Sequence, residues 1–231
     1  MVGWLRVRWP LDSLVALVLA GLLSPIVSAL AVMVRLHDPG PALIRLERVG
    51  QNGQPFWQWK LRSMRSTSAS GSSTGAPITV ADDPRVTELG RHLRRWRIDE
   101  LPQLINVIAG QMALLGPRPE TPSYVDLADS RWQEVLRARP GIAGPTQILV
   151  ADWEEEFVAS NQDGDTYGNV VVPLKLAIDL WYVRSASPWI DLLVLIALFQ
   201  RFFGPPSRTA LYVRVMREVP AASLLRSIVS G

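Results

Sequence analysis

Cysteine is absent from this chain of 231 residues, and histidine occurs only twice, as His37 and His92. Disulfide bonds and thiolate metal sites are therefore excluded. A zinc site built from several histidines is excluded as well, because two histidines are too few for one. Any bound metal would be a hard cation with oxygen ligands, such as magnesium.

Lysine is also scarce, and Lys60 and Lys175 are the only two. Arginine therefore supplies nearly all the positive charge of a chain whose formal net charge is +3. An arginine excess suits phosphate recognition and anionic lipid headgroups equally well. Dinucleotide-binding, P-loop and serine-hydrolase motifs are missing from the sequence.

One long apolar segment, residues 14–34, carries no charged side chain. As a helix it would be about 31 Å long, which is enough to cross a bilayer. It has no small-residue cleavage site after it and exceeds the core of a signal peptide, so we expect it to be retained. Ser24 and Pro25 lie in its middle, where proline removes a helical hydrogen bond and predicts a kink.

Positive charge flanks this apolar segment on both sides. Arg6 and Arg8 precede it, and Arg35, Arg45 and Arg48 follow it. A simple span favours positive charge on one side only. Two interpretations stay open: an ordinary kinked span, and a helix that bends at its proline and returns to the same membrane face.

The remainder predicts a mixed α/β, helix-rich region. Loops are expected at residues 66–75 and 161–168, and a rigid turn-rich segment at 139–145. The expected strands and helices are strands over 42–48 and 55–61 around a turn at 50–53, and helices over 84–97, 99–109 and 123–137.

Apolar character returns toward the C-terminus. Residues 175–183 predict a short amphipathic helix. The apolar run over 188–203 is too short to span a membrane, so it is either a core helix or a helix in the membrane interface. The tail from 208 to 231 mixes apolar residues with arginines and is compatible with a membrane surface.

Two strings point to chemistry. IDELPQL at 98–104 places the carboxylates of Asp99 and Glu100 directly after the basic run RHLRRWR, and LGPRP at 115–119 holds Arg118 between two prolines. An arginine can grip phosphate oxygens in a bidentate fork. A carboxylate can ligate a divalent metal or act as a nucleophile. The combination favours phosphoryl chemistry on a diphosphate.

Each residue also has an ordinary structural explanation. Asp99 suits a helix N-cap, with Glu100 in the first turn and Gly110 at the helix end. Arg94 is typical of a solvated or lipid-facing helix edge, and Lys60 of a surface lysine. The two interpretations of the acidic pair are compatible, because a carboxylate near Arg94 at a helix N-terminus stays ionised. The string LGPRP has no evident packing purpose.

Several strings occur together in a fixed order. They are KLRSM at 60–64, DPRVTELG at 83–90, the block 94–104, residues 106–110, LGPRP, RPGIAG at 139–144 and DLWYV at 179–183. In this combination the chain resembles the bacterial sugar transferases, which are monotopic polyprenyl-phosphate phosphoglycosyl transferases, over residues 10–203. We expect the small, catalytic-core form, because no multi-span region precedes the apolar segment in the sequence.

The resemblance implies a role for each site residue. Asp99 would be the nucleophile that attacks a nucleotide diphosphate-sugar, with UDP as the expected nucleotide. Glu100 and Asp99 would bind Mg²⁺, and Lys60, Arg94 and Arg118 would hold phosphate oxygens. Undecaprenyl phosphate would then accept the sugar phosphate from Asp99. The glycan pathway and the sugar are not implied.

The resemblance also implies an architecture and a location. The chain would be a monotopic membrane protein with a kinked re-entrant helix, in which Ser24-Pro25 matches the family's helix break, and with interfacial amphipathic helices. Residues 1–36 would form the re-entrant helix, 37–203 the catalytic domain and 204–231 the tail. Its place would be the cytosolic face of a bacterial inner membrane. Membrane lipids are expected partners and nucleic acid is not; a homo-oligomer is compatible with the sequence.

Three departures from the family pattern involve no proposed catalytic side chain. Ala113 replaces a usual serine, Trp96-Arg97 replaces smaller residues, and Pro145 replaces an aliphatic residue. They bear on sugar choice. Two other functions stay open. Intact site residues argue against a catalytically silent scaffold, and a basic lipid-binding protein does not explain an acidic pair inside a basic cluster.

Overall fold

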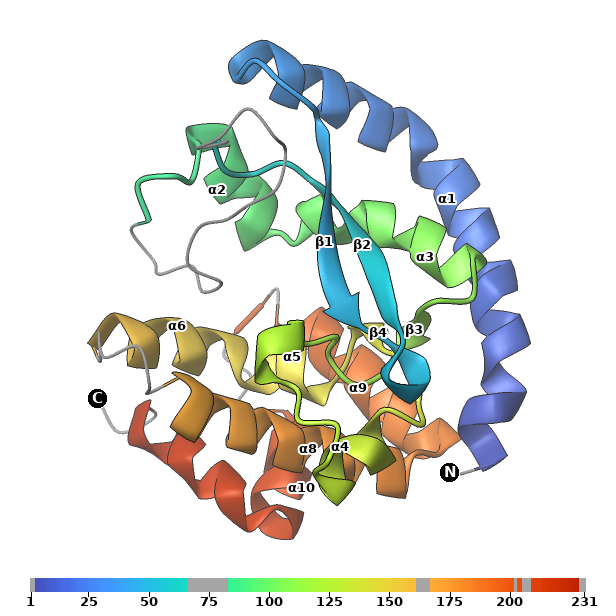
Figure 1. The fold of residues 1–231 in the computed structure, drawn as a ribbon, viewed down its shortest axis with the longest axis vertical. Helices are drawn as coiled ribbons and strands as arrows, with labels where there is room; N and C mark the ends of the chain where they lie inside the picture. The colour runs from blue at the N-terminus through green and yellow to red at the C-terminus, as the bar shows by residue number, and fades with distance from the viewer. Residues whose placement is uncertain (1–2, 66–82, 161–166, 202, 205–208, 229–231) are drawn as a thin grey trace.

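The computed structural model describes residues 3–65, 83–160, 167–201, 203–204 and 209–228. Helix α1 (Gly3–His37) arches along one side of the molecule, and the hairpin of β1 (Leu43–Val49) and β2 (Pro55–Leu61) runs lengthwise beside it (Figure 1). The helices from α4 (Ser130–Val135) onward gather at one end (Figure 1). The loop predicted at 66–75, and most of the one at 161–168, lie outside the described residues. The helix-rich mixed α/β class is confirmed.

Helix α1 continues without interruption through Pro25. The Ser24 hydroxyl donates a hydrogen bond of 2.8 Å to the Gly21 carbonyl, which would otherwise accept from the backbone N–H that proline lacks. Among the described residues α1 is the one helix long and apolar enough to cross a membrane, and little of its most apolar stretch is buried. It indicates membrane association. The kink and the return to the same face stay predictions.

The first turns of α1 are anchored in the rest of the protein. Arg8 is buried and donates to the Asp191 carboxylate, to the Leu115 carbonyl and, at 3.1 Å, to the Tyr182 hydroxyl. The Trp4 indole N–H donates to the same carboxylate at 2.7 Å. This end of the helix is therefore held by charge pairing and hydrogen bonds as well as by apolar contact.

The predicted hairpin is confirmed. Strands β1 (Leu43–Val49) and β2 (Pro55–Leu61) pair antiparallel around the turn η1 (Gln51–Gly53), where Gly53 has a φ of +75°. Asn106 attaches the next helical region to β2, because its side chain donates to the Trp57 carbonyl at 2.8 Å.

The helix predicted over 99–109 is instead two elements, the 3₁₀ helix η2 (Ile98–Gln103) and α3 (Leu104–Ile108). Arg97 precedes η2 in a left-handed conformation with a φ of 52°. The N-cap position therefore falls on Arg97, and the N-cap interpretation of Asp99 is wrong. Gly110, with a φ of +72°, follows the end of α3 as expected.

Two other predicted helices are shorter than expected. Thr87 caps α2 (Glu88–Arg95) by accepting from the Gly90 N–H at 2.9 Å, so this helix begins later than residue 84. The segment 123–137 contains only the short elements η3 (Pro122–Tyr124) and α4 (Ser130–Val135).

Two strands were not predicted. The strand β3 (Ala113–Leu115) pairs in parallel with β4 (Gly141–Ala143). Strand β4 lies inside the segment 139–145, which was expected to be turns. A Cβ on Gly141 would lie 2.1 Å from the Gly116 nitrogen, and one on Gly144 would lie 2.1 Å from the Gly116 oxygen. Only glycines allow this approach. Gly116 therefore has a packing purpose, contrary to the sequence interpretation of LGPRP.

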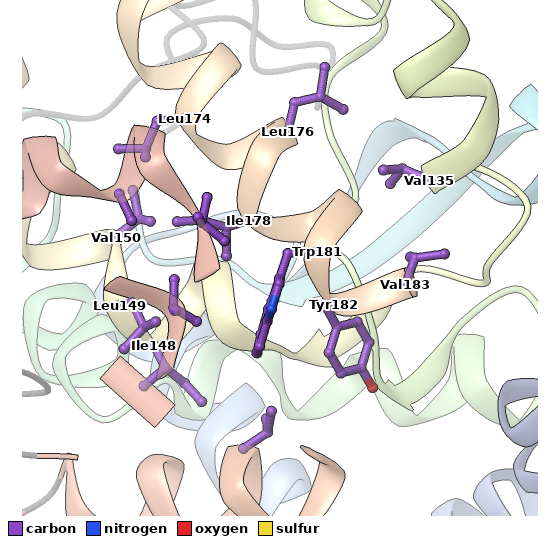
Figure 2. Close-up of a cluster of buried hydrophobic side chains, with 14 of the residues drawn as sticks. Val135, Ile148, Leu149, Val150, Leu174, Leu176, Ile178, Trp181, Tyr182 and Val183 are labelled. Carbon is purple, nitrogen blue, oxygen red and sulfur yellow. The ribbon is translucent and has the colours of Figure 1, made fainter. Parts of the chain in front are cut away.

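The main core forms where the C-terminal helices meet. Figure 2 shows Ile148, Leu174, Ile178 and Tyr182 among its members, and all four are almost fully buried. The elements around it are α5 (Pro145–Leu149), α6 (Ala151–Ser160), η4 (Tyr167–Val171), α8 (Val172–Ser185), α9 (Pro188–Gln200), α10 (Ala210–Glu218) and η6 (Pro220–Ile228).

Helix α8 corrects the prediction of an amphipathic helix over 175–183. Lys175 and Asp179 are as deeply buried as the apolar Leu176 and Ile178. Buried ionisable side chains need partners. Lys175 donates to Glu154 at 2.8 Å, so its charge is paired inside the protein.

Helix α9 is confirmed as a core helix on one side, and its contact with a membrane interface stays a prediction. One side, with Ile190 and Val194, is buried in the core. The other exposes large apolar side chains, among them Trp189, Leu195 and Phe199. Such an exposed apolar strip is typical of a helix that contacts a membrane interface. The tail packs against this end, with buried residues in α10 and η6, and its membrane-surface placement stays a prediction.

Candidate active site

The acidic pair lies against the second strand of the hairpin. Lys60, near the end of β2, places its Nζ 2.9 Å from Glu100 Oε1. An Arg97 guanidinium nitrogen lies 3.8 Å from the same oxygen. The left-handed turn at Arg97 brings this side chain back toward the pair, where its other nitrogen donates to the Gln147 carbonyl at 3.0 Å.

Glu100 is held in the ionised form. Burial alone would raise its pKa, but the charges of Lys60, Arg97 and Arg118 together outweigh that effect and lower the pKa of Glu100 to about 2. A permanently ionised carboxylate cannot act as a general acid. It can hold a cation or compensate the surrounding positive charge.

Asp99 differs from its neighbour. It is only 7% exposed, and burial raises the pKa of Asp99 above its ordinary value, although Lys60 and Arg94 oppose the shift. Less stabilised by cations than Glu100, this carboxylate is the more basic and the more nucleophilic of the two. Arg94, in the last turn of α2, is near enough to act on Asp99 through its charge.

Arg118 is positioned by the glycine contact between LGPRP and RPGIAG. Its backbone N–H donates to Asp179 Oδ2 at 3.2 Å, and the Thr146 hydroxyl donates to the other oxygen of that carboxylate. Burial raises the pKa of Asp179 to about 7. The Arg118 guanidinium is desolvated, yet Glu100 and other acids raise its pKa, so it stays charged.

These side chains share a small cavity. Its wall includes Lys60, Glu100 and Arg118, but not Asp99 or Arg94. The structure therefore brings three of the five predicted site residues around one space, with Asp99 beside it and Arg94 linked through charge. Cations facing a permanent carboxylate form an environment suited to phosphate oxygens.

Sequence reasoning missed two glutamines in this wall. Gln103 and Gln147 are buried, and among the described residues neither the Nε2 of Gln103 nor the Oε1 of Gln147 has a hydrogen-bond partner. Buried polar atoms without partners are costly. A free donor and a free acceptor beside Lys60 and Arg118 are expected where a ligand supplies the missing partners. Gln103 lies three residues after Glu100, and that proximity was the available signal.

Arg48 was also missed as a site residue. It lies in β1, lines the cavity and donates to the Thr121 hydroxyl at 3.0 Å. Burial lowers the pKa of Arg48 below its ordinary value, although the charge of Glu120 opposes the shift. Counting Arg48 as a flanking charge of the apolar segment hid its place beside the carboxylate pair.

The acidic pair bears on magnesium binding. The described residues hold no cluster of three or more acidic, histidine or cysteine side chains suited to a metal. Mg²⁺, however, is often bound by one or two carboxylates together with substrate phosphates and water. Asp99 and Glu100 fit that requirement, since both are carboxylates and the low pKa of Glu100 keeps it ionised at neutral pH.

Comparison with known proteins identifies a family for the chain. The bacterial sugar transferase family model matches residues 5–204. The Aeromonas hydrophila UDP-N-acetylgalactosamine-undecaprenyl-phosphate N-acetylgalactosaminephosphotransferase is 34% identical over 189 residues, 80% of this chain and 40% of that protein. The Escherichia coli UDP-glucose:undecaprenyl-phosphate glucose-1-phosphate transferase is 33% identical over 199 residues, 83% of this chain and 39% of that protein.

A third relative is similar in length. Exopolysaccharide production protein ExoY of Sinorhizobium fredii is 32% identical over 195 residues, 79% of either chain. The chain spans about two fifths of the length of the other two relatives. Because the family model covers nearly the whole chain, the resemblance seen in the sequence is confirmed: the chain belongs to the bacterial sugar transferase family.

Proposed function

We propose that this chain transfers a sugar-1-phosphate from a UDP-sugar to undecaprenyl phosphate and so initiates the assembly of a surface glycan. The observation that carries the proposal is the buried pair Asp99-Glu100 beside Lys60 and Arg118, in a chain with a long exposed apolar helix. The names of the relatives support the donor and acceptor classes.

The first step forms a covalent intermediate. A carboxylate oxygen of Asp99 attacks the phosphorus that carries the sugar. The bond from that phosphorus to the bridging oxygen breaks, and the electron pair leaves with the nucleoside monophosphate. Lys60, Arg94 and Arg118 stabilise the negative charge on the phosphate oxygens.

The second step regenerates the enzyme. A phosphate oxygen of undecaprenyl phosphate attacks the phosphorus of the acyl phosphate. The bond to Asp99 breaks, the carboxylate is restored and the sugar diphosphate lipid leaves. Both displacements occur at the same phosphorus atom. One positively charged environment therefore serves both, because each step places charge on the same phosphoryl oxygens.

Asp99 and Glu100 would hold the magnesium ion, which neutralises diphosphate charge when bound. Glu100 suits this role because its low pKa keeps it anionic throughout turnover. Lys60 orients it through the contact to Oε1, which fixes the position of the carboxylate.

We place the protein at the cytosolic face of a bacterial inner membrane, with α1 re-entrant and the apolar face of α9 in the interface. The acceptor phosphate is tethered to a lipid and cannot leave the surface, so the site must lie at the same level. The exposed Trp189 on α9 supports this placement, because tryptophan prefers the interface.

Release of nucleoside monophosphate from a panel of nucleotide sugars tests the proposal. Purified protein in lipid is assayed with magnesium, with and without undecaprenyl phosphate. We expect acceptor-dependent UMP from one donor, and a loss of at least about a thousandfold in Asp99→Asn. Asp126→Asn, which alters an exposed carboxylate, is the matched control. Wild-type rates in Asp99→Asn would reject the covalent mechanism, and silence of the folded wild type across the panel would favour a scaffold.

A further inference from the structure

A second cavity lies away from the candidate active site. It has a volume of about 520 Å³ and is lined by Arg6 and Trp9 of α1, Gln51 and Asn52 of the hairpin turn, and Arg137 just after α4. None of these residues lines the active-site cavity. This cleft stands where the chain leads into its apolar segment.

The polar wall of the cleft is fixed. The Gln51 side chain donates to the Arg137 carbonyl at 3.0 Å, and the Asn52 backbone N–H donates to the Leu136 carbonyl at 2.6 Å. These bonds tie the hairpin turn to the end of α4. The cleft is therefore bounded by backbone held in place on both sides.

Two guanidinium groups in the cleft are available to a ligand. Within the described part of the chain, the side chains of Arg6 and Arg137 form no salt bridge or hydrogen bond. Glu134 feels the charge of Arg137, but its carboxylate is paired with Arg184 at 2.7 Å. Unpaired arginines facing one space are a receptor for an anion, and phosphate oxygens match their fork geometry.

A third cation, Arg139, contacts the tryptophan that lines the cleft. The Arg139 guanidinium lies over the Trp9 ring, 4.4 Å from its centroid. The Nε of Arg139 is buried and has no hydrogen-bond partner among the described residues. Trp9 thus lines the cleft with a ring that also contacts a cation, and tryptophan is a residue that favours the membrane interface.

The surface next to the cleft is suited to acyl chains. Arg6, Pro10, Leu14 and Leu17 follow one another at helical spacing on α1. Leu14 and Leu17 are both more than half exposed. A ligand with its phosphate at Arg6 could lay hydrocarbon along this strip, which a free phosphate would leave uncovered.

We propose that this cleft binds the phosphate headgroup of a membrane lipid, and that its ordinary occupant is an anionic phospholipid of the surrounding bilayer. The bound lipid fixes the depth at which α1 enters the membrane. The acceptor carries the same chemical group, so the test must separate the two sources.

The test measures lipid binding to the purified full-length chain by native mass spectrometry, using phosphatidylglycerol in phosphatidylcholine micelles. The double variant Arg6→Gln/Arg137→Gln removes the two free cations. Arg91→Gln/Arg95→Gln, on the exposed side of α2, removes equal charge elsewhere. We expect the first variant to bind phosphatidylglycerol about tenfold more weakly or worse, and the second to stay within about twofold of wild type.

Equal loss in both double variants would overturn the proposal, since attraction would then depend on net charge alone. Unchanged binding in the first variant would overturn it as well, since the cleft arginines would then not hold the lipid. Competition identifies the source. Phosphatidylglycerol that resists displacement by equimolar undecaprenyl phosphate supports the bulk lipid. Displacement sensitive to Arg6 and Arg137 would refute that source and assign the cleft to the acceptor. Equally tight binding of inorganic phosphate would refute the contribution of the acyl chains.

Discussion

Lys60 and Glu100 lie forty residues apart in the chain, and their charged atoms meet at 2.9 Å. One belongs to the end of a hairpin and the other to a 3₁₀ turn. The contact fixes the ionised form of Glu100 and brings the acidic pair beside the hairpin. It is the link that turns two separate strings of the sequence into one site.

Lys60→Met should raise the pKa of Glu100 and destabilise the fold by about 1–3 kcal/mol at pH 7, because a buried carboxylate loses its closest cation. Glu100 has a folded pKa below its unfolded value of 4.5, so its stabilisation is present above pH 4.5 and is lost as the pH falls toward 2. In Lys60→Met the protein should therefore lose less stability between pH 4.5 and pH 2 than the wild type does.

Thermal unfolding against pH measures the effect, and Lys60→Arg is the control that keeps the charge. We expect Lys60→Arg to recover more stability than UMP release, since a planar guanidinium cannot reproduce the ammonium position. An unchanged melting temperature in Lys60→Met would mean that Arg97 and Arg118 hold Glu100 without help.

Gln103→Met should separate stability from activity. The substitution removes a buried amide nitrogen that has no partner in the described structure, so the melting temperature should stay the same or rise. If the amide binds substrate, turnover should fall about tenfold or more. Loss of both stability and activity would instead show that Gln103 is a packing residue. Unfolding and UMP release on one preparation decide between the two.

Asp179 should make the protein less stable as pH rises from about 4 to about 7. Its folded pKa of about 7 exceeds the unfolded value of 3.8, so the folded state retains a proton that the unfolded state has lost. The slope is at most about 1.4 kcal/mol per pH unit. In Asp179→Asn the melting temperature should depend less on pH over this range. Asp126→Asn should not, and a slope surviving in Asp179→Asn would exclude this carboxyl as its source.

The membrane path of α1 can be mapped with single cysteines, because the natural chain has none. We expect Gly3→Cys and His37→Cys to react with a membrane-impermeant reagent from the same, cytosolic side. Adding Pro25→Ala should expose position 37 on the other side in part of the population and lower UMP release. Labelling of the two positions from opposite faces in active protein would exclude the re-entrant helix.

The hairpin could be predicted because alternating residues and a Gly-rich turn are local signals. The helix expected over 99–109 could not be divided correctly, since its first turn depends on a left-handed Arg97 whose side chain is held by the distant Gln147 carbonyl. Helix α8 looked amphipathic for a similar reason. Partners that neutralise Lys175, such as Glu154, come from other elements and leave no periodic pattern.

Of the predicted site residues, Lys60, Glu100 and Arg118 lie around one cavity, and their roles stay predictions. Gln147 and Arg48 were missed because only tertiary structure brings them to that cavity. The contact of Gly116 with Gly141 likewise depends on a parallel strand pair formed across 25 intervening positions of chain.

The attachment of Arg8 to the Leu115 carbonyl has a consequence for engineering. Leu115 begins the string that carries Arg118. The hydrogen bond from Arg8 therefore attaches α1 to the loop that contains a candidate site residue. A chimera that imports α1 from a relative must therefore keep an arginine at position 8 and a carboxylate at position 191. Exchanging the helix as an interchangeable anchor would move the loop, even where the foreign helix inserts normally.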